Sequence, residues 1–234
     1  MLYSFLKYEH LKFLTSYQFI APVFTYLLWV IGIYIYRDMP VLSSYGSTAI
    51  GLFIVMTWMT IINFGRDTLN ERHIFYMQLK SKTTYLLIKI LYLYLFSTLL
   101  IVFSLIYPLL LSVFDKPVSF NFVLIGVVTH LLLSMFGIVL GAFITNTKIA
   151  TKSYRWLLTI FIMLIIFTKE VLITTVPFTK WLLWLLPPIS NLLNQLNSDN
   201  LSMLNNHFLL LCLFAVIYIL IALKLLIVLF KNTE

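Results

Sequence analysis

The first 147 residues of this chain contain four stretches that carry no Asp, Glu, Lys or Arg over at least 24 consecutive residues. At a rise of about 1.5 Å per residue, a helix of that length measures roughly 36 Å and can cross ~30 Å of hydrocarbon. With 62% hydrophobic and 10% charged residues, the chain cannot cover the surface of a water-soluble fold with polar groups. It is therefore predicted to be an all-helical, polytopic membrane protein. The uncharged stretches are residues 13–36, 39–65, 90–114 and 117–147.

Six membrane-spanning helices are expected in a single transmembrane domain, residues 1–234. The fifth is the least regular, because Lys169 and Glu170 interrupt its apolar run and are placed near the far interface. The sixth contains Lys224, whose long stem can reach the nearer surface. At about 20 residues per span, little chain remains for a separate catalytic or ATP-binding domain. The expected spans are residues 18–36, 45–65, 83–112, 120–145, 156–173 and 207–230.

Basic residues predict the orientation of these spans. Because cytoplasmic loops are enriched in Lys and Arg, both termini are expected in the cytoplasm, with the chain in the cell membrane. The first apolar run is long enough to stay as a span, so no cleaved signal peptide is expected. The net charge of +8 is then mainly cytoplasmic and requires no nucleic-acid partner. Ten basic residues fall inside and four outside: Lys7, Lys12, Arg66, Arg72, Lys80, Lys82, Lys148, Lys152, Arg155 and Lys231 against Arg37, Lys116, Lys169 and Lys180.

Residues 65–82 form the longest predicted cytoplasmic connection and have the pattern of an amphipathic helix of about three turns. In one interpretation this helix lies on the membrane surface and only separates two spans. In the functional interpretation it is a docking helix whose exposed face, around Glu71, fits a groove on a cytoplasmic partner. At 100° per residue, one face holds Asp67, Glu71, Ile74 and Gln78, and the other holds Leu69, Arg72, Phe75, Tyr76 and Leu79.

Residues 174–206, between the fifth and sixth spans, are predicted to form a re-entrant helical hairpin on the extracellular side. The apolar run 181–186 is too short to span, and it ends at Pro187 and Pro188, which disfavour a continuing helix. A second short helix is expected at 189–196. A surface loop with an amphipathic helix is the alternative interpretation.

Gly137 and Gly141 form a GxxxG pair in the fourth span. Small residues at this spacing let two helix backbones approach closely. The pair is compatible with packing inside one chain or with dimerisation between chains, and packing inside the chain is favoured.

Sequence patterns typical of nucleotide-binding, catalytic or metal sites are weak in this chain. Residues 46–51 have the glycine spacing of a phosphate loop but lack the Lys that follows it. His130 and Ser134 share a helix face without a carboxylate to orient them, and polar residues in spans more often bond a neighbouring helix. A single Cys212 offers no metal cluster, and sparse intramembrane carboxylates disfavour an ion-driven carrier. No catalytic, cofactor or metal site is therefore expected in this chain.

A resemblance arises in the loop between the second and third spans. It begins with Asp67 and Glu71, continues as Leu79-Lys80-Ser81-Lys82, and leads to Ile88 and Lys89 just inside the next span. This pattern resembles the permease subunits of ABC-2 type exporters, in which an acidic start and basic residues precede Gly-Lys. Here Ile88 stands in place of that Gly. Charged residues before the first span and a broken hairpin before the last one agree with the family.

The resemblance implies an architecture and a set of partners. Residues 65–82 would be the coupling helix, residues 1–16 an interfacial connecting helix, and two permeases, identical or homologous, would assemble in membrane lipid over two ABC ATPase subunits. ATP and magnesium would bind those partner subunits. From the sequence itself, Leu2, Leu6 and Phe13 share a face of the N-terminal helix, but Glu9 lies on that face too. The coupling-helix residues predicted to contact the ATPase are Asp67, Glu71, Arg72, Ile74, Phe75, Gln78 and Lys80; those with a predicted structural or interface role are Lys89, Gly137, Gly141, Pro187 and Pro188.

The expected function is that of a transmembrane subunit of an ATP-driven exporter. The chain is rich in aromatic residues, with 20 Phe, 14 Tyr and 5 Trp in total, which suits an amphipathic or hydrophobic cargo such as a peptide, a lipid-like molecule or a drug. In size and composition the chain is similar to short permeases of bacterial exporters for amphipathic peptide toxins, including phenol-soluble modulins, and of lantibiotic self-immunity systems. The alternatives are an intramembrane, protease-like enzyme and a channel or structural membrane protein.

Overall fold

The computed structural model describes residues 2–147, 149, 151, 153–196 and 206–232, and every element in these ranges is helical. Five helices are long and apolar enough to cross a membrane, and a sixth span is obtained if the bent pair α1 and α2 is counted as one. The chain is therefore consistent with a multi-pass membrane protein, as predicted. The elements are α1 (Leu2–Thr15), α2 (Ile20–Ile33), α3 (Val41–Gly65), α4 (Leu69–Leu79), α5 (Lys82–Leu111), α6 (Phe120–Asn146), α7 (Arg155–Thr175), η1 (Pro177–Thr179), α8 (Lys180–Leu183), α9 (Ile189–Leu196) and α10 (Asn206–Lys231).

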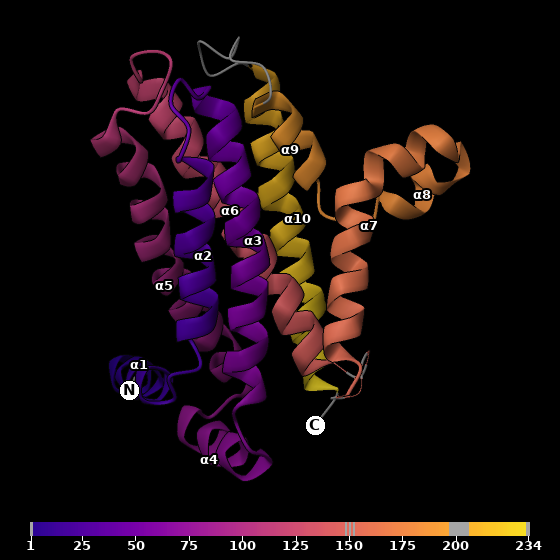
Figure 1. Cartoon of the computed structure of the whole chain (residues 1–234). Coiled ribbons are helices and arrows are strands. Elements are labelled where there is room, and N and C mark those ends of the chain that lie inside the picture. The colour runs from indigo at the N-terminus through magenta and orange to yellow at the C-terminus, as the bar shows by residue number, and fades with distance from the viewer. Residues whose placement is uncertain (1, 148, 150, 152, 197–205, 233–234) are drawn as a thin grey trace.

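The first predicted span, 18–36, is shorter in the structure than expected. Helix α2 has 14 residues, which at about 1.5 Å per residue is roughly 21 Å and too short to cross the hydrocarbon. It follows α1 after a bend of 79°. Consequently α1 lies across the lower end of the bundle while α2 runs alongside α3 (Figure 1).

Helix α3 is the centre of the bundle and is buried along most of its length. It crosses α6 closely, because a Cβ added at Gly137 would lie 2.5 Å from the Phe53 carbonyl oxygen and one at Gly141 would lie 2.7 Å from that of Thr57. Both glycines thus pack against α3 of the same chain, which is one of the two arrangements that the GxxxG pair allowed.

Helices α7 and α8 stand apart from the rest of the bundle (Figure 1). The turn at Pro187 and Pro188 separates α8 from α9, whose bounds agree with the predicted helix at 189–196. Helix α9 buries Ile189 and Leu192, whereas α8 leaves Trp181 largely exposed. The predicted hairpin is thus two short helices in different environments, and its residues 197–205 lie outside the described part of the chain.

Candidate functional site

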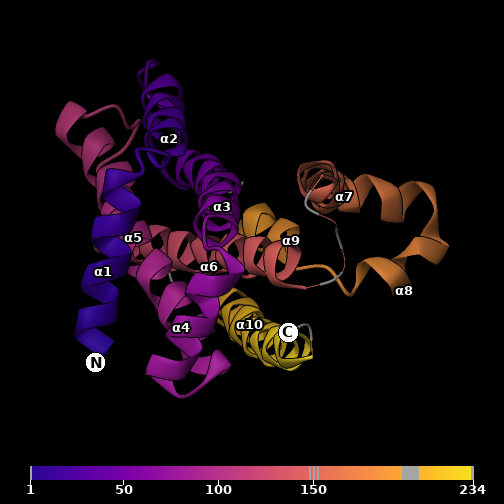
Figure 2. The same ribbon diagram turned by 90° about the horizontal axis from the view of Figure 1, so that it is seen from below.

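Helices α1 and α4 lie across the same end of the bundle, where α3 ends and α5 begins (Figure 2). The start of α4 is set by a capping box in which the Thr68 hydroxyl accepts from the Glu71 amide and the Glu71 carboxylate accepts from the Thr68 amide. The helix ends at Lys80, which adopts the left-handed conformation at φ 56°. Local sequence therefore confines α4 to a short element outside the candidate spans.

A buried cluster of charges joins these four helices. We call it the charge cluster; its members are Glu9 and Lys12 of α1, Asn63 of α3, Arg66, Asp67, Glu71 of α4, and Tyr85 and Lys89 of α5.

The centre of the charge cluster is the ion pair between Lys89 and Asp67. Lys89 Nζ lies 2.5 Å from Asp67 Oδ2 and donates to the Asn63 carbonyl oxygen at 3.0 Å. The Tyr85 hydroxyl donates to the same carboxylate oxygen at 2.5 Å. Tyr85 and Lys89 are four residues apart, so α5 presents both on one face. The segment that leads into α4 is thereby attached directly to the first turns of α5.

Helix α1 joins the charge cluster through two side chains. Glu9 Oε1 accepts from Asn63 at 2.7 Å and from Arg66 at 3.0 Å, and it lies 3.4 Å from Lys89 Nζ. Lys12 Nζ bridges Asp67 at 2.7 Å and Glu71 at 3.0 Å. The six charges are three cations (Lys12, Arg66, Lys89) and three anions (Glu9, Asp67, Glu71), so they balance within the cluster. Buried charges are tolerated only when paired in this way.

The pKa values of the cluster's groups outside the candidate spans reflect this pairing. Burial by itself would raise the pKa of Asp67, but the Lys89 charge and hydrogen bonds from Lys12, Lys89 and Tyr85 hold it well below its usual range. A backbone hydrogen bond from Thr68, together with Lys12, lowers the pKa of Glu71. Burial would lower the pKa of Lys12, but its hydrogen bonds to Asp67 and Glu71 raise it overall. All three groups are therefore charged at neutral pH.

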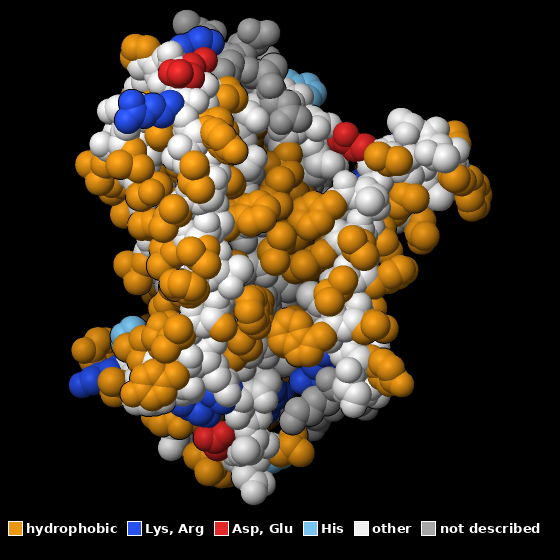
Figure 3. Space-filling model, in the orientation of Figure 1, with side chains coloured by type: hydrophobic (Ala, Val, Ile, Leu, Met, Phe, Trp, Pro, Cys, Tyr) orange, Lys and Arg blue, Asp and Glu red, His pale blue; other side chains and the backbone are white. Residues whose placement is uncertain are grey.

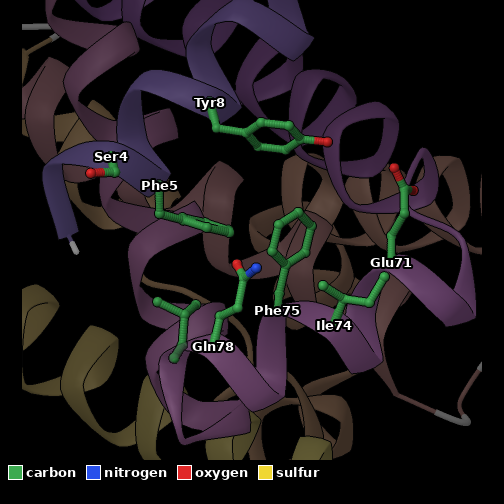
Figure 4. Close-up of a pocket in the computed structure, with 8 residues that line it drawn as sticks. Ser4, Phe5, Tyr8, Glu71, Ile74, Phe75 and Gln78 are labelled. Carbon is green, nitrogen blue, oxygen red and sulfur yellow. The ribbon is translucent and has the colours of Figure 1, made fainter.

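An open groove of about 630 Å³ lies between α1 and α4. Its floor is aromatic: Phe5 and Phe75 pack edge to face with ring centroids 4.9 Å apart, and Tyr8 lies 5.4 Å from Phe75. Figure 4 shows these rings turned toward one another, with Ile74, Gln78 and Glu71 along the α4 side. The groove thus combines an apolar floor with a polar rim. Its lining residues are Ser4, Phe5, Tyr8, Glu71, Ile74, Phe75, Gln78 and Leu79.

The residues of segment 65–82 that are predicted to contact a partner differ in their exposure within the chain. Asp67, Arg72 and Phe75 are buried within the chain, and Arg72 donates to the Phe64 carbonyl oxygen at 2.8 Å. Asp67 and Arg72 are thus engaged in contacts inside the chain, whereas Phe75 also lines the groove between α1 and α4. The predicted residues that remain accessible are Glu71, Ile74, Gln78 and Lys80.

Several residues of the charge cluster were missed at the level of sequence. Glu9 carried a signal, since it is the one carboxylate on an otherwise apolar helix face. Lys89 was expected to have a structural role, but its partner was not identified. Asn63 and Tyr85 resemble ordinary span residues, and no pattern in the sequence distinguishes them. Their roles depend on helices that are distant in sequence coming together.

His130 and Ser134, which share a helix face in the sequence analysis, both form hydrogen bonds in the structure. Both ring nitrogens of His130 are engaged, Nε2 with the Thr48 hydroxyl at 3.0 Å and Nδ1 with the Gly126 carbonyl oxygen at 2.7 Å. Ser134 donates to the Leu131 carbonyl oxygen at 2.9 Å. His130 thus bonds a side chain of α3 and the backbone of its own helix α6, and Ser134 bonds the backbone of α6. Among the described residues, no group of three or more His, Cys, Asp or Glu is placed to hold a metal ion.

Acid is expected to weaken the attachment of α1 to α4. The pKa of Glu71 is lowered in the folded state, so its contribution to stability is present above the unfolded value of about 4.3 and is lost as pH falls through the folded value. The thermal unfolding midpoint in a nonionic detergent should decrease below about pH 4. The decrease should be smaller in Glu71→Gln; an equal decrease would contradict this role of Glu71.

Comparison with protein-family models, with curated proteins and with solved structures finds no match to this chain.

Proposed function

We propose that this chain is the transmembrane subunit of an ATP-driven exporter of the ABC-2 type, and that a separate ATPase subunit docks on α4 and on the groove between α1 and α4. The supporting observation is the buried Lys89–Asp67 ion pair at 2.5 Å. It ties the base of the long helix α5 to the segment entering α4, so a force applied to α4 is transmitted to α5 without passing through a flexible loop.

The accessible part of α4 has the character of a docking surface. Ile74 is 49% exposed and Met77 is 74% exposed, although both are large apolar side chains on a helix outside the candidate spans. Exposed apolar residues beside an aromatic groove are typical of a protein contact. With both termini in the cytoplasm, as the basic residues predict, this surface would face a cytoplasmic ATPase.

The cargo in this proposal is amphipathic or hydrophobic. A cavity of about 320 Å³ between α6, α7 and α10 is lined almost entirely by apolar side chains, including Phe143, Ile162 and Leu225. Such a cavity has few groups that could replace the hydration of a strongly polar cargo. It lies on the side where α7 stands apart, so a second permease, identical or homologous, could contribute the opposite wall of a pathway.

Arginine at Ile74 is expected to prevent docking. The charge would enter the apolar part of the groove and remove a central apolar contact. The ATPase activity that co-purifies with the chain should therefore fall roughly tenfold or more. The measurement is ATPase activity of the affinity-purified chain from its native host, in detergent.

The matched control is Ile35→Arg, the same change at a 69% exposed position beyond the other end of α2. It should retain the activity of the unmodified protein. Absence of ATP hydrolysis from the unmodified preparation, or equal activity of the Ile74 and Ile35 variants, would contradict the proposal. A channel or structural membrane protein would give the first of these results.

A further inference from the structure

A third pocket, of about 420 Å³, shares no lining residue with the groove between α1 and α4. Three elements form it: the chain entering α2, the end of α3 and the start of α7. It lies where two candidate spans end, because α3 stops at Gly65 and α7 begins at Arg155. The lining residues are Gln18, Ala21, Trp58, Ile61, Ile62, Gly65, Arg66, Arg155 and Trp156.

The two arginines of this pocket differ in how their charges are compensated. Arg66 pairs with Glu9 at 3.0 Å and donates to the Lys12 carbonyl oxygen at 2.8 Å. No carboxylate in the described ranges pairs with Arg155, and its Nε is buried without a hydrogen-bond partner among them. The pocket therefore has one arginine, Arg155, that lacks a carboxylate partner in the described ranges and has an unsatisfied buried donor.

Aromatic side chains frame the same pocket. Trp58 of α3 and Trp156 of α7 pack edge to face with ring centroids 6.4 Å apart. Tryptophan is enriched at membrane–water interfaces, where one side of the indole is apolar and the other is wet. Together with the ends of two candidate spans, this pair indicates that the pocket lies at the level of lipid headgroups.

In Figure 3, hydrophobic side chains line a hollow between α3 and α7, and Lys or Arg atoms lie at its foot, the end at which α3 stops and α7 begins. A second aromatic pair, Phe53 of α3 and Phe167 of α7, lies farther along the two helices, with ring centroids 6.0 Å apart. Basic side chains below an apolar hollow match the two parts of a phospholipid, which are its phosphate and its acyl chains.

We propose that this pocket binds the phosphate of an anionic phospholipid, with Arg155 as its principal ligand and an acyl chain in the hollow between α3 and α7. The guanidinium offers a planar fork of donors that pairs bidentately with phosphate oxygens. Inorganic phosphate shares this chemistry, but it would leave the apolar hollow unused, and the hollow is the reason for assigning the lipid.

The charge is tested by Arg155→Gln, with Arg37→Gln as the matched control at an exposed position beyond the opposite end of α2. Delipidated protein in nonionic detergent is titrated with phosphatidylglycerol, with phosphatidylcholine of the same acyl chains, and with inorganic phosphate, and bound lipid is measured by native mass spectrometry. The unmodified protein should bind phosphatidylglycerol roughly tenfold more tightly than phosphatidylcholine. Both lipids carry the phosphate, but the choline cation of phosphatidylcholine cancels the negative charge that Arg155 would pair with. Arg155→Gln should lose this preference and Arg37→Gln should keep it.

The shape of the pocket is tested without changing any charge. A Cβ at Gly65 would have no atom within 4 Å, so Gly65→Leu fits the helix and fills the pocket; Gly32 in α2 has the same open surroundings and supplies the control Gly32→Leu. Gly65→Leu should weaken phosphatidylglycerol binding several-fold, while Gly32→Leu leaves it unchanged. If Arg155→Gln fails to fold, the comparison of Gly65→Leu with Gly32→Leu still tests the proposal.

Three results would overturn the proposal. The first is equal binding of phosphatidylglycerol and phosphatidylcholine by the unmodified protein. The second is displacement of the lipid by inorganic phosphate at equal concentration, which would make the pocket a simple anion site. The third is equal loss of binding in the variants and their controls, which would mean that the lipid binds elsewhere on the surface.

Discussion

Replacing Lys89 with Met is expected to destabilise the protein by about 3–5 kcal/mol, the typical loss when one partner of a buried ion pair is removed. Lys89 is fully buried and lies within 3.4 Å of two carboxylates, those of Glu9 and Asp67. Methionine preserves the length and apolar packing of the side chain, so the expected loss arises from the uncompensated carboxylates. Chemical or thermal unfolding in detergent measures it.

The control for this change is Lys224→Met, the same substitution at an exposed position in α10. Surface changes of this kind usually alter stability by less than about 0.5 kcal/mol. The double variant Lys89→Met with Asp67→Asn should be less destabilised than the sum of its single variants, because it removes both charges of the central pair. Additive losses would show that the two residues are not coupled.

Alanine at Gly137 is expected to lower the free energy of unfolding by about 1–3 kcal/mol, as overpacking of a tight interface does. The added Cβ would lie 2.5 Å from the Phe53 carbonyl oxygen and 3.2 Å from the Thr57 amide nitrogen. Both contacts are to backbone, which cannot rotate away as a side chain can. The helices α3 and α6 would have to separate, and the loss of their packing should appear as a lower unfolding midpoint.

Alanine at Gly32 is the matched control, because a Cβ there would have no neighbour within 4 Å. Alanine is favoured over glycine in a helix by about 0.5–1 kcal/mol, so Gly32→Ala should be neutral or slightly stabilising. Opposite signs for the two variants are therefore expected. A neutral Gly137→Ala would mean that α3 and α6 do not pack as closely as in this structure.

Much of the helical layout could be predicted from the uncharged stretches. The spans expected at 83–112 and 120–145 agree within a residue with α5 and α6, because a charge or a capping residue marks each boundary. The amphipathic segment 65–82 contains α4, whose limits follow from the capping box and the left-handed Lys80. The span expected at 18–36 agreed least well, since an uncharged stretch does not reveal the 79° bend between α1 and α2.

The candidate site was only partly predictable. An amphipathic pattern shows which residues share a helix face, but it does not show what that face contacts. Asp67, predicted to face a partner, instead pairs with Lys89 and Lys12, and Arg72 is buried beside the end of α3. The sequence identifies no partner for either Lys89 or Arg155, although in the structure one is fully paired and the other has no carboxylate partner in the described ranges.

Local composition specifies where most of the helices form and which of them suit a bilayer, since hydropathy and capping act over a few neighbouring residues. The close crossing of α3 and α6, the charge cluster and the basic pocket beside α7 depend on residues up to about 140 positions apart in the sequence. Only packing brings those residues together, because contacts between distant helices form when the chain folds and are not encoded in any short stretch of sequence.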